Sequence, residues 1–212
     1  MQRTATLLAI ASVLALTPAL ATAADFTVTA SNAYVWEQQA VVFTKKPVIN
    51  VDSTWDLSHG LSADVWAQYG DKDGRELDVS VAKEWQVQSG TVTVSTGGYF
   101  TAYAPVYFAE VGTSMPLGPV SLDLGAARYT GSYQSVMVSA ALTAVLPITS
   151  RFKPSLTAGI AHNSERHAAN WFGRVAVPIG NPDRGISLGV RGFCDFDGCR
   201  QRHFAVDISK SF

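Results

Sequence analysis

The densest group of side chains that could carry out chemistry is the run His162-Asn163-Ser164-Glu165-Arg166-His167. It holds a hydroxyl, two imidazoles and a carboxylate, which are the parts of a nucleophile–base arrangement. No G-x-S-x-G motif frames the serine, and the two histidines lack the H-E-x-x-H spacing of a helical zinc pair. We therefore predict no catalytic residue and no metal ligand here, and expect a solvated loop whose Arg166 is available to contact phosphate groups.

The two cysteines, Cys194 and Cys199, are predicted to form one local disulfide in an oxidising compartment. Their spacing is not that of a Cys-x-x-Cys redox motif, and no histidine pair stands nearby to complete a metal site. The stretch Asp195-x-Asp197-Gly198 resembles a calcium loop but lacks the twelve-residue frame and the terminal glutamate. The formal net charge of −1 argues against nucleic-acid binding. No cofactor is predicted.

The N-terminus has the layout of a secretory signal peptide. Arg3 supplies a positive charge, Leu7 to Leu16 is almost entirely apolar, and Ala21-Thr22-Ala23 is an A-x-A cleavage site. The apolar run is too short for a membrane anchor, which needs roughly 20 residues, and an uncleaved anchor helix is the alternative. We expect residues 1–23 to be removed and residues 24–212 to form one domain in the outer membrane of a Gram-negative bacterium.

The apolar residues of this domain recur with period two, which predicts β-strands. The polar residues between them therefore lie on the opposite face of each strand. In the segment from Leu61 to Tyr69 every second residue is apolar or aromatic, and residues 136–146 repeat the pattern. Tight turns alternate with longer polar loops, which is typical of an antiparallel up-and-down transmembrane β-barrel. We predict twelve strands, with eight or ten as alternatives, at residues 25–36, 47–57, 61–69, 76–87, 91–100, 105–115, 119–129, 135–148, 152–162, 170–179, 185–193 and 203–212.

The last strand favours an outer-membrane barrel over a soluble β-sandwich. Phe204, Val206, Ile208 and Phe212 share one face, and the chain ends on the aromatic residue itself. Outer-membrane proteins end in such a strand, and we predict that Phe212 is the signal for the barrel-assembly machinery. Lys210 interrupts the apolar face, but near the end of the strand it can extend to the headgroups.

The chain also resembles the TorF-type (Gcw_chp) outer-membrane porin family. The resemblance rests on the segment from Ser31 to Trp36, on Glu76-Leu77-Asp78-Val79 and on the segment from Val206 to Phe212. The stretch Glu37-Gln38-Gln39-Ala40 departs from the Arg-Gly-Ile-like sequence of the family. Membership would imply a porin fold and a location in the outer membrane.

Charged residues at the alternating polar positions are predicted to face the barrel lumen. Residues 24–150 hold 6 basic and 12 acidic residues, whereas residues 151–212 hold 9 and 5. Because successive strands follow each other around a barrel, an acidic wall should face a basic wall across the lumen and set up a transverse field. The predicted pore-lining residues are Asp52, Asp56, Asp64, Glu76, Asp78, Glu84, Glu110, Asp123, Lys153, Arg174, Arg191 and Asp207.

These patterns predict a narrow passive channel for ions or small hydrophilic solutes, with no enzymatic activity. Outer-membrane lipid, lipopolysaccharide, the assembly machinery and small solutes are the expected partners. Two alternatives stay open: the charges pair and plug the lumen of a non-conducting structural or adhesive barrel, or the protein is a lipid-modifying enzyme.

Overall fold

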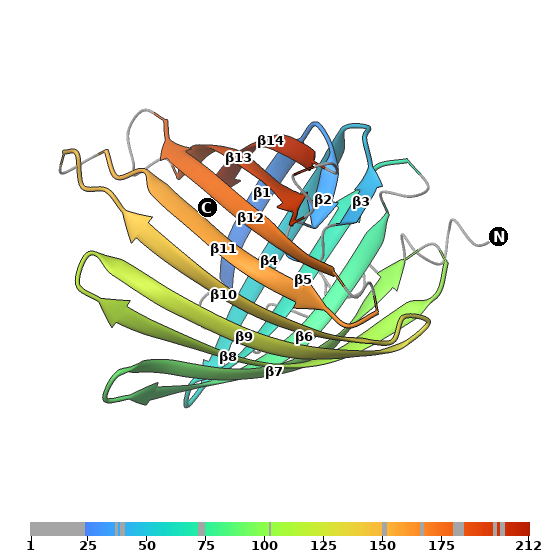
Figure 1. Ribbon diagram of the computed structural model, residues 1–212, viewed down its shortest axis with the longest axis horizontal. Helices are drawn as coiled ribbons and strands as arrows, with labels where there is room; N and C mark the ends of the chain where they lie inside the picture. The colour runs from blue at the N-terminus through green and yellow to red at the C-terminus, as the bar shows by residue number, and fades with distance from the viewer. Residues whose placement is uncertain are drawn as a thin grey trace.

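The computed structural model describes residues 24–36, 38, 41–71, 75–101, 103–149, 152–165, 168–179, 185–196, 199 and 202–212. Twelve strands close into one antiparallel barrel, in which β1 pairs with both β4 and β14, while β2 and β3 form a separate two-stranded sheet (Figure 1). The strands are β1 (Ala24–Ser31), β2 (Tyr34–Trp36), β3 (Val41–Thr44), β4 (Val48–Ser58), β5 (Leu61–Tyr69), β6 (Glu76–Val87), β7 (Gly90–Thr101), β8 (Pro105–Leu117), β9 (Val120–Gly131), β10 (Ser135–Val145), β11 (Ser155–Asn163), β12 (Ala168–Pro178), β13 (Ile186–Asp195) and β14 (Arg202–Ser211).

The closed barrel confirms the predicted all-β fold class and the strand number of twelve. Tight turns gather at the end where the C-terminus lies, and the β2–β3 hairpin lies at the opposite end (Figure 1). The predicted signal peptide, residues 1–23, lies outside the described residues. Within the described part of the chain, no helix is long and apolar enough to cross a membrane.

The first strand ends earlier than predicted. The expected strand 25–36 leaves the barrel wall after Ser31, and Tyr34–Trp36 becomes the separate strand β2. At Asn32 the backbone N–H donates to the carbonyl of Val206 at 3.1 Å, while the side-chain oxygen accepts from the N–H of Val206 at 2.8 Å. Because the side chain replaces the main-chain carbonyl as acceptor, the backbone can turn inward without leaving Val206 unpaired.

The strand expected at 152–162 begins only at Ser155, so Lys153 lies in the connector and not in a strand. Pro154 explains the late start, because proline has no N–H to donate to a β-ladder. Its carbonyl still accepts a hydrogen bond from the N–H of Leu146 at 2.9 Å.

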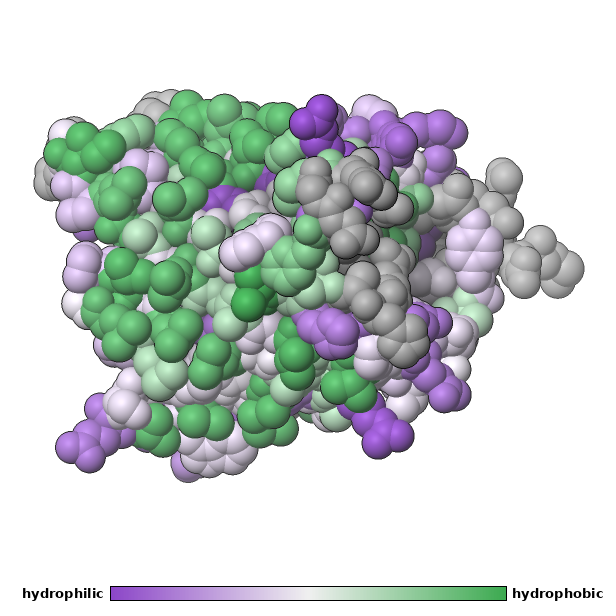
Figure 2. Space-filling view, in the orientation of Figure 1, coloured by the Kyte–Doolittle hydropathy of each residue, from purple (hydrophilic) through white to green (hydrophobic). Residues whose placement is uncertain are grey.

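The outer wall of the barrel is covered by large apolar side chains. Val111, Leu142, Ile160 and Val190 are each more than two-fifths exposed, as are many others at the same alternating positions. Hydrophobic residues gather over the strands facing the viewer in Figure 2, and hydrophilic ones concentrate at the end that carries the longer loops. Water-soluble monomers rarely expose an apolar surface of this size. We therefore expect the outer wall of the barrel to contact lipid.

Residues at the C-terminus close the barrel at the tight-turn end. The N–H of Phe212 donates to the carbonyl of Phe26 at 2.9 Å, and the two rings lie 5.8 Å apart between centroids. The ammonium of Lys210 lies 4.2 Å from the centroid of the Phe212 ring. The charge that interrupts the apolar face therefore lies over an aromatic ring near the end of the strand.

The outer wall makes a testable prediction about stability. Val94, at the middle of β7, is 44% exposed, whereas its neighbour Ser95 takes the opposite face and pairs with Glu110 of β8. In phospholipid vesicles, Val94→Arg should lower the free energy of unfolding by about 2–4 kcal/mol, because a charge would enter the lipid core. Ser95→Arg is the matched control and should cost clearly less in the same denaturant titration. Equal costs would contradict a lipid-facing outer wall.

Candidate functional site in the barrel lumen

A hairpin folded into the barrel is the central feature of the lumen. It comprises β2, β3 and their connection, lies between β1 and β4, and is called the inner hairpin below. Val35 is 1% exposed and, with Ala33, packs against Phe172 and Phe193 on the inner faces of β12 and β13. The inner hairpin is therefore held by apolar contacts with the strands that close the barrel.

On its other side the inner hairpin meets an aromatic cluster. The ring of Trp36 makes edge contacts with Tyr99 at 5.3 Å and Tyr129 at 5.8 Å, and Tyr99 stacks on Phe108 at 4.8 Å. Gly97 lies opposite Phe108 in the β7–β8 register, and a Cβ atom built there would come within 2.9 Å of the Phe108 ring. A side chain at Gly97 would therefore displace the stacked rings.

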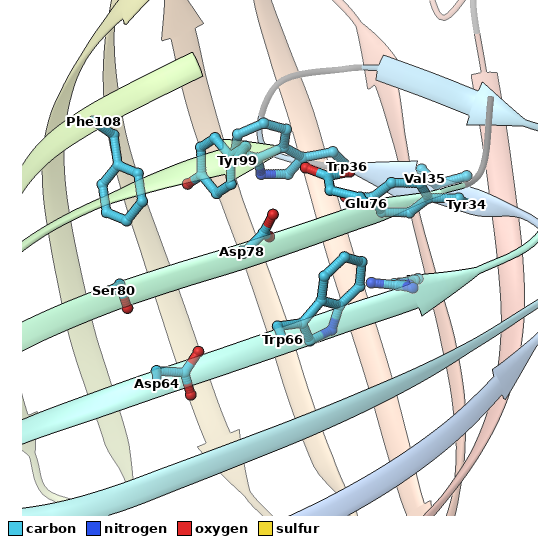
Figure 3. A pocket seen from close by; sticks show the side chains of 11 residues that line it. Tyr34, Val35, Trp36, Asp64, Trp66, Glu76, Asp78, Ser80, Tyr99 and Phe108 are labelled. Carbon is cyan, nitrogen blue, oxygen red and sulfur yellow. The ribbon is translucent and has the colours of Figure 1, made fainter. Parts of the chain in front are cut away.

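Carboxyl groups from three neighbouring strands, β4, β5 and β6, form the facing side of the lumen. Asp64 lies on β5, while Glu76 and Asp78 lie on β6, and the register places Trp66 opposite Asp78. Figure 3 shows Glu76 beside Tyr34 and Trp36, with Asp78, Trp66 and Asp64 below them in the view. This acidic wall is defined here as Asp52, Asp64, Glu76 and Asp78.

The inner hairpin also contacts the acidic wall directly. The Tyr34 hydroxyl is hydrogen-bonded to the side chain of Glu76, and the Tyr34 ring lies 5.6 Å from that of Trp66. Burial, together with the negative charges of Glu76 and Asp78, raises the pKa of Tyr34 well above its usual value. The hydroxyl therefore stays protonated at neutral pH and donates to the carboxylate.

A cavity of about 330 Å³ lies between the inner hairpin, the aromatic cluster and the acidic wall. Its lining combines the rings of Tyr34, Trp36, Trp66 and Tyr99 with Arg191 and with three carboxyl groups of the acidic wall, those of Asp64, Glu76 and Asp78. Such a lining can surround a solute with charge and with flat apolar surfaces at once. Among the described residues, no group of three or more His, Cys, Asp or Glu side chains could hold a metal ion.

Arg191 of β13 is the basic residue that lines the cavity. Its Nε lies 3.5 Å from Oδ2 of Asp207, and both side chains are largely buried. A Cβ atom at Gly189 would come within 2.1 Å of Oδ1 of Asp207, so glycine leaves the space that this carboxylate occupies. Arg191 and three residues of the acidic wall line the same cavity, although they lie on different parts of the barrel wall: Asp64, Glu76 and Asp78.

The other predicted pore-lining residues are distributed along the lumen. Glu110 and Asp123 take lumen-facing register positions, and Asp123 accepts hydrogen bonds from Ser114 at 2.6 Å and Thr143 at 3.1 Å. Three further predicted residues also lie on the inner face of the barrel but are exposed to solvent: Asp56, Glu84 and Arg174. The structure thus brings Asp64, Glu76, Asp78 and Arg191 to one cavity and leaves the others outside it.

Other candidates from the sequence form no joint site. Cys194 and Cys199 are joined by a disulfide. Ser164 accepts a hydrogen bond from the N–H of Val136 at 2.8 Å, which gives its hydroxyl a structural role at the strand end. Arg166, His167 and Asp197 lie outside the described residues.

Tyr34 and Trp36 were missed as site residues, because the alternating pattern assigned them to the first barrel strand. The length of that predicted strand, twelve residues, gives no signal of the break, because β6, β7 and β9 of the barrel are equally long.

Three solved structures have a similar fold. The KdgM porin in complex with disordered oligogalacturonate has a TM-score of 0.63 and 7% sequence identity, covering 89% of this chain and 98% of that porin. The NanC porin has a TM-score of 0.59 and 11% identity, covering 90% of this chain and 99% of that chain. An outer-membrane channel from Pseudomonas putida F1 has a TM-score of 0.54 and 10% identity, covering 90% and 95%. At these identities the comparison shows a shared barrel fold. The sequence matches no protein-family model and no curated protein.

The ion pair between Arg191 and Asp207 makes a prediction about stability. Asp207→Ala removes a carboxylate that is 3% exposed from beside a guanidinium that is 16% exposed. Removing one partner of a largely buried ion pair should lower the free energy of unfolding by about 3 kcal/mol, measured by urea titration in phospholipid vesicles. Asp56→Ala removes an exposed lumen carboxylate and should change stability by less than about 0.5 kcal/mol. Equal losses would show that the buried pair has no special role.

Proposed function

We propose that the protein is a passive outer-membrane channel with a narrow lumen for ions or small hydrophilic solutes. The observation that carries the proposal is the contrast between the two faces of one closed sheet. The outward positions are apolar, and the inward positions carry charged side chains, some of them exposed to water. A barrel with these two faces separates lipid from an aqueous interior.

The inner hairpin narrows this channel at the end that carries the longer loops. Tyr34, Val35 and Trp36 fill lumen space that twelve strands alone would leave open. Asp56, Glu84 and Arg174 are exposed elsewhere on the inner face, so the lumen is not filled along its whole length. The constriction at the cavity would therefore determine which solutes pass.

The location and the partners follow from the same proposal. The KdgM and NanC structures, which share the fold, are described as porins, and a porin role here places the chain in the outer membrane after export. Lipopolysaccharide would surround the outer wall, and the assembly machinery would bind the C-terminal strand through Phe212. Membership of the TorF-type family rests on the short motifs in the sequence and stays a prediction.

Recordings in planar lipid bilayers test the channel. The refolded protein should produce discrete conductance steps in KCl, smaller than those of wide porins because of the constriction. Reversing a lumen charge in Asp64→Lys or Arg191→Glu should shift the reversal potential in a salt gradient in opposite directions, because each variant changes the field at the constriction. Val94→Ser, on the outer wall, is the control. A correctly folded protein with no conductance would overturn the proposal and indicate a structural or adhesive barrel.

Replacing the inner hairpin tests the constriction separately. Ser31 and Val48 lie opposite each other in the β1–β4 register, so a two-residue Asn-Gly turn can replace residues 32–47. The shortened barrel should conduct severalfold more than the full chain, because the aromatic and apolar side chains in the lumen are removed. Trp36→Ala, which keeps the loop, should raise conductance less. Unchanged conductance in both folded variants would place the hairpin outside the permeation path.

A further inference from the structure

We propose that the lumen cavity binds an aliphatic diammonium or polyammonium cation, and that this is the class of solute the channel selects. The inference rests on the proposed channel and names the ligand chemistry of its constriction. It follows from three features of the cavity: paired carboxyl groups, aromatic faces and the pairing of its arginine.

The carboxyl groups of the acidic wall stand in two hydrogen-bonded pairs. Glu76 is hydrogen-bonded to Asp78, and Asp52 to Asp64. Two carboxyl groups in such contact must hold a proton between them unless another cation neutralises them. An ammonium group can take the place of that proton and has three N–H donors to distribute between the two carboxylates. Two adjacent pairs match a ligand that carries at least two ammonium groups.

One atom of each pair lacks a protein donor. Oδ1 of Asp78 and Oδ1 of Asp52 are buried and have no hydrogen-bond partner among the described residues. Buried carboxylate oxygens are nearly always paired, because an unpaired one loses its hydration without compensation. Asp78 lines the cavity, so a donor that enters it approaches the carboxyl group with the unpaired oxygen. Asp52 lies behind the lining and is linked to the cavity through its hydrogen bond with Asp64.

Aromatic rings supply the second feature. Trp66 projects beside Asp78, and Tyr34 and Trp36 lie above it, so the carboxyl groups are framed by ring faces (Figure 3). An ammonium group is attracted to an aromatic face, and alkyl carbons pack against the same surface. A bare metal ion would use neither the apolar faces nor the length of the cavity. A volume of about 330 Å³ lies at the lower end of ligand-pocket sizes, which suits a short alkyl chain with bound water.

The arginine does not convert the cavity into an anion site. Arg191 lies beside Asp207, with Nε 3.5 Å from Oδ2, so its charge is offset within the barrel wall. The carboxyl groups of the acidic wall therefore outnumber the available positive charge. A sugar acid or another anionic solute would be repelled by the acidic wall and would leave its buried oxygens unpaired.

Block of the potassium current by spermidine tests the site, with putrescine as the shorter probe. Added to one side of the bilayer, spermidine should reduce the current of the unmodified channel in a concentration-dependent manner. Glu76→Gln and Asp78→Asn should each raise the blocking concentration about tenfold, because each removes a charged hydrogen-bond acceptor. Trp66→Leu should raise it about fivefold through loss of the aromatic face, whereas Trp66→Phe should retain most of the block.

Glu84→Gln is the matched control, because Glu84 is an exposed inward carboxylate that does not line the cavity. It should leave the blocking concentration unchanged. A channel that conducts but is blocked equally in all variants, or is blocked by digalacturonate and not by spermidine, would overturn the ammonium site and leave the proposed channel intact. If the protein does not conduct, the channel fails, and calorimetric titration of spermidine into the detergent-solubilised full chain still decides the site: tight binding lost in Asp78→Asn supports it, and no binding overturns it.

Discussion

Closure of the hydrogen-bonded ladder is the constraint on which the rest of the structure depends. Strand β1 pairs on one side with β4 and on the other with β14, so no barrel strand is left with an unpaired edge. In lipid an unpaired backbone group costs several kcal/mol, which is why closed barrels and helices are the structures that span membranes. Closure also divides every strand into an inner and an outer face, and this division separates the apolar wall from the charged lumen.

Side chains fill some parts of the barrel interior more than others. Glycines in the barrel wall provide the space for two of the buried lumen groups. Gly97 leaves room for the Phe108 ring in the aromatic cluster, and Gly189 leaves room for the Asp207 carboxylate beside Arg191. Larger side chains at either position would push a lumen group toward the centre. The cavity therefore depends on the absence of side chains at two wall positions as much as on the carboxyl groups and rings that line it.

The period-two pattern was sufficient to predict the twelve barrel strands and the inward face of the charged residues that lie on them, although Lys153 lies in a connector. Asp64, Asp78 and Arg191 were assigned inward from local alternation, and the register of the barrel gives them the same face. The inner hairpin could not be predicted in this way, because Tyr34-Val35-Trp36 continues the alternation of β1. The strand ends at Asn32 through contacts with Val206, which is 174 residues further along the chain. Similarly, the meeting of Arg191 with the acidic wall depends on the diameter of the closed barrel, which no local pattern encodes.

The packing of the inner hairpin implies an order of assembly. Its buried residue Val35 belongs to the same cluster as Phe172 and Phe193, and Asn32 is bonded to Val206, so its partners lie on β12, β13 and β14 at the end of the chain. The inner hairpin precedes these strands in the sequence, yet its docking surface is complete only after β12, β13 and β14 have joined the sheet. Because contacts with high sequence separation form late, we expect the assembling barrel to pass through a stage in which the inner hairpin is not yet docked. Maturation of the lumen is thus coupled to completion of the barrel.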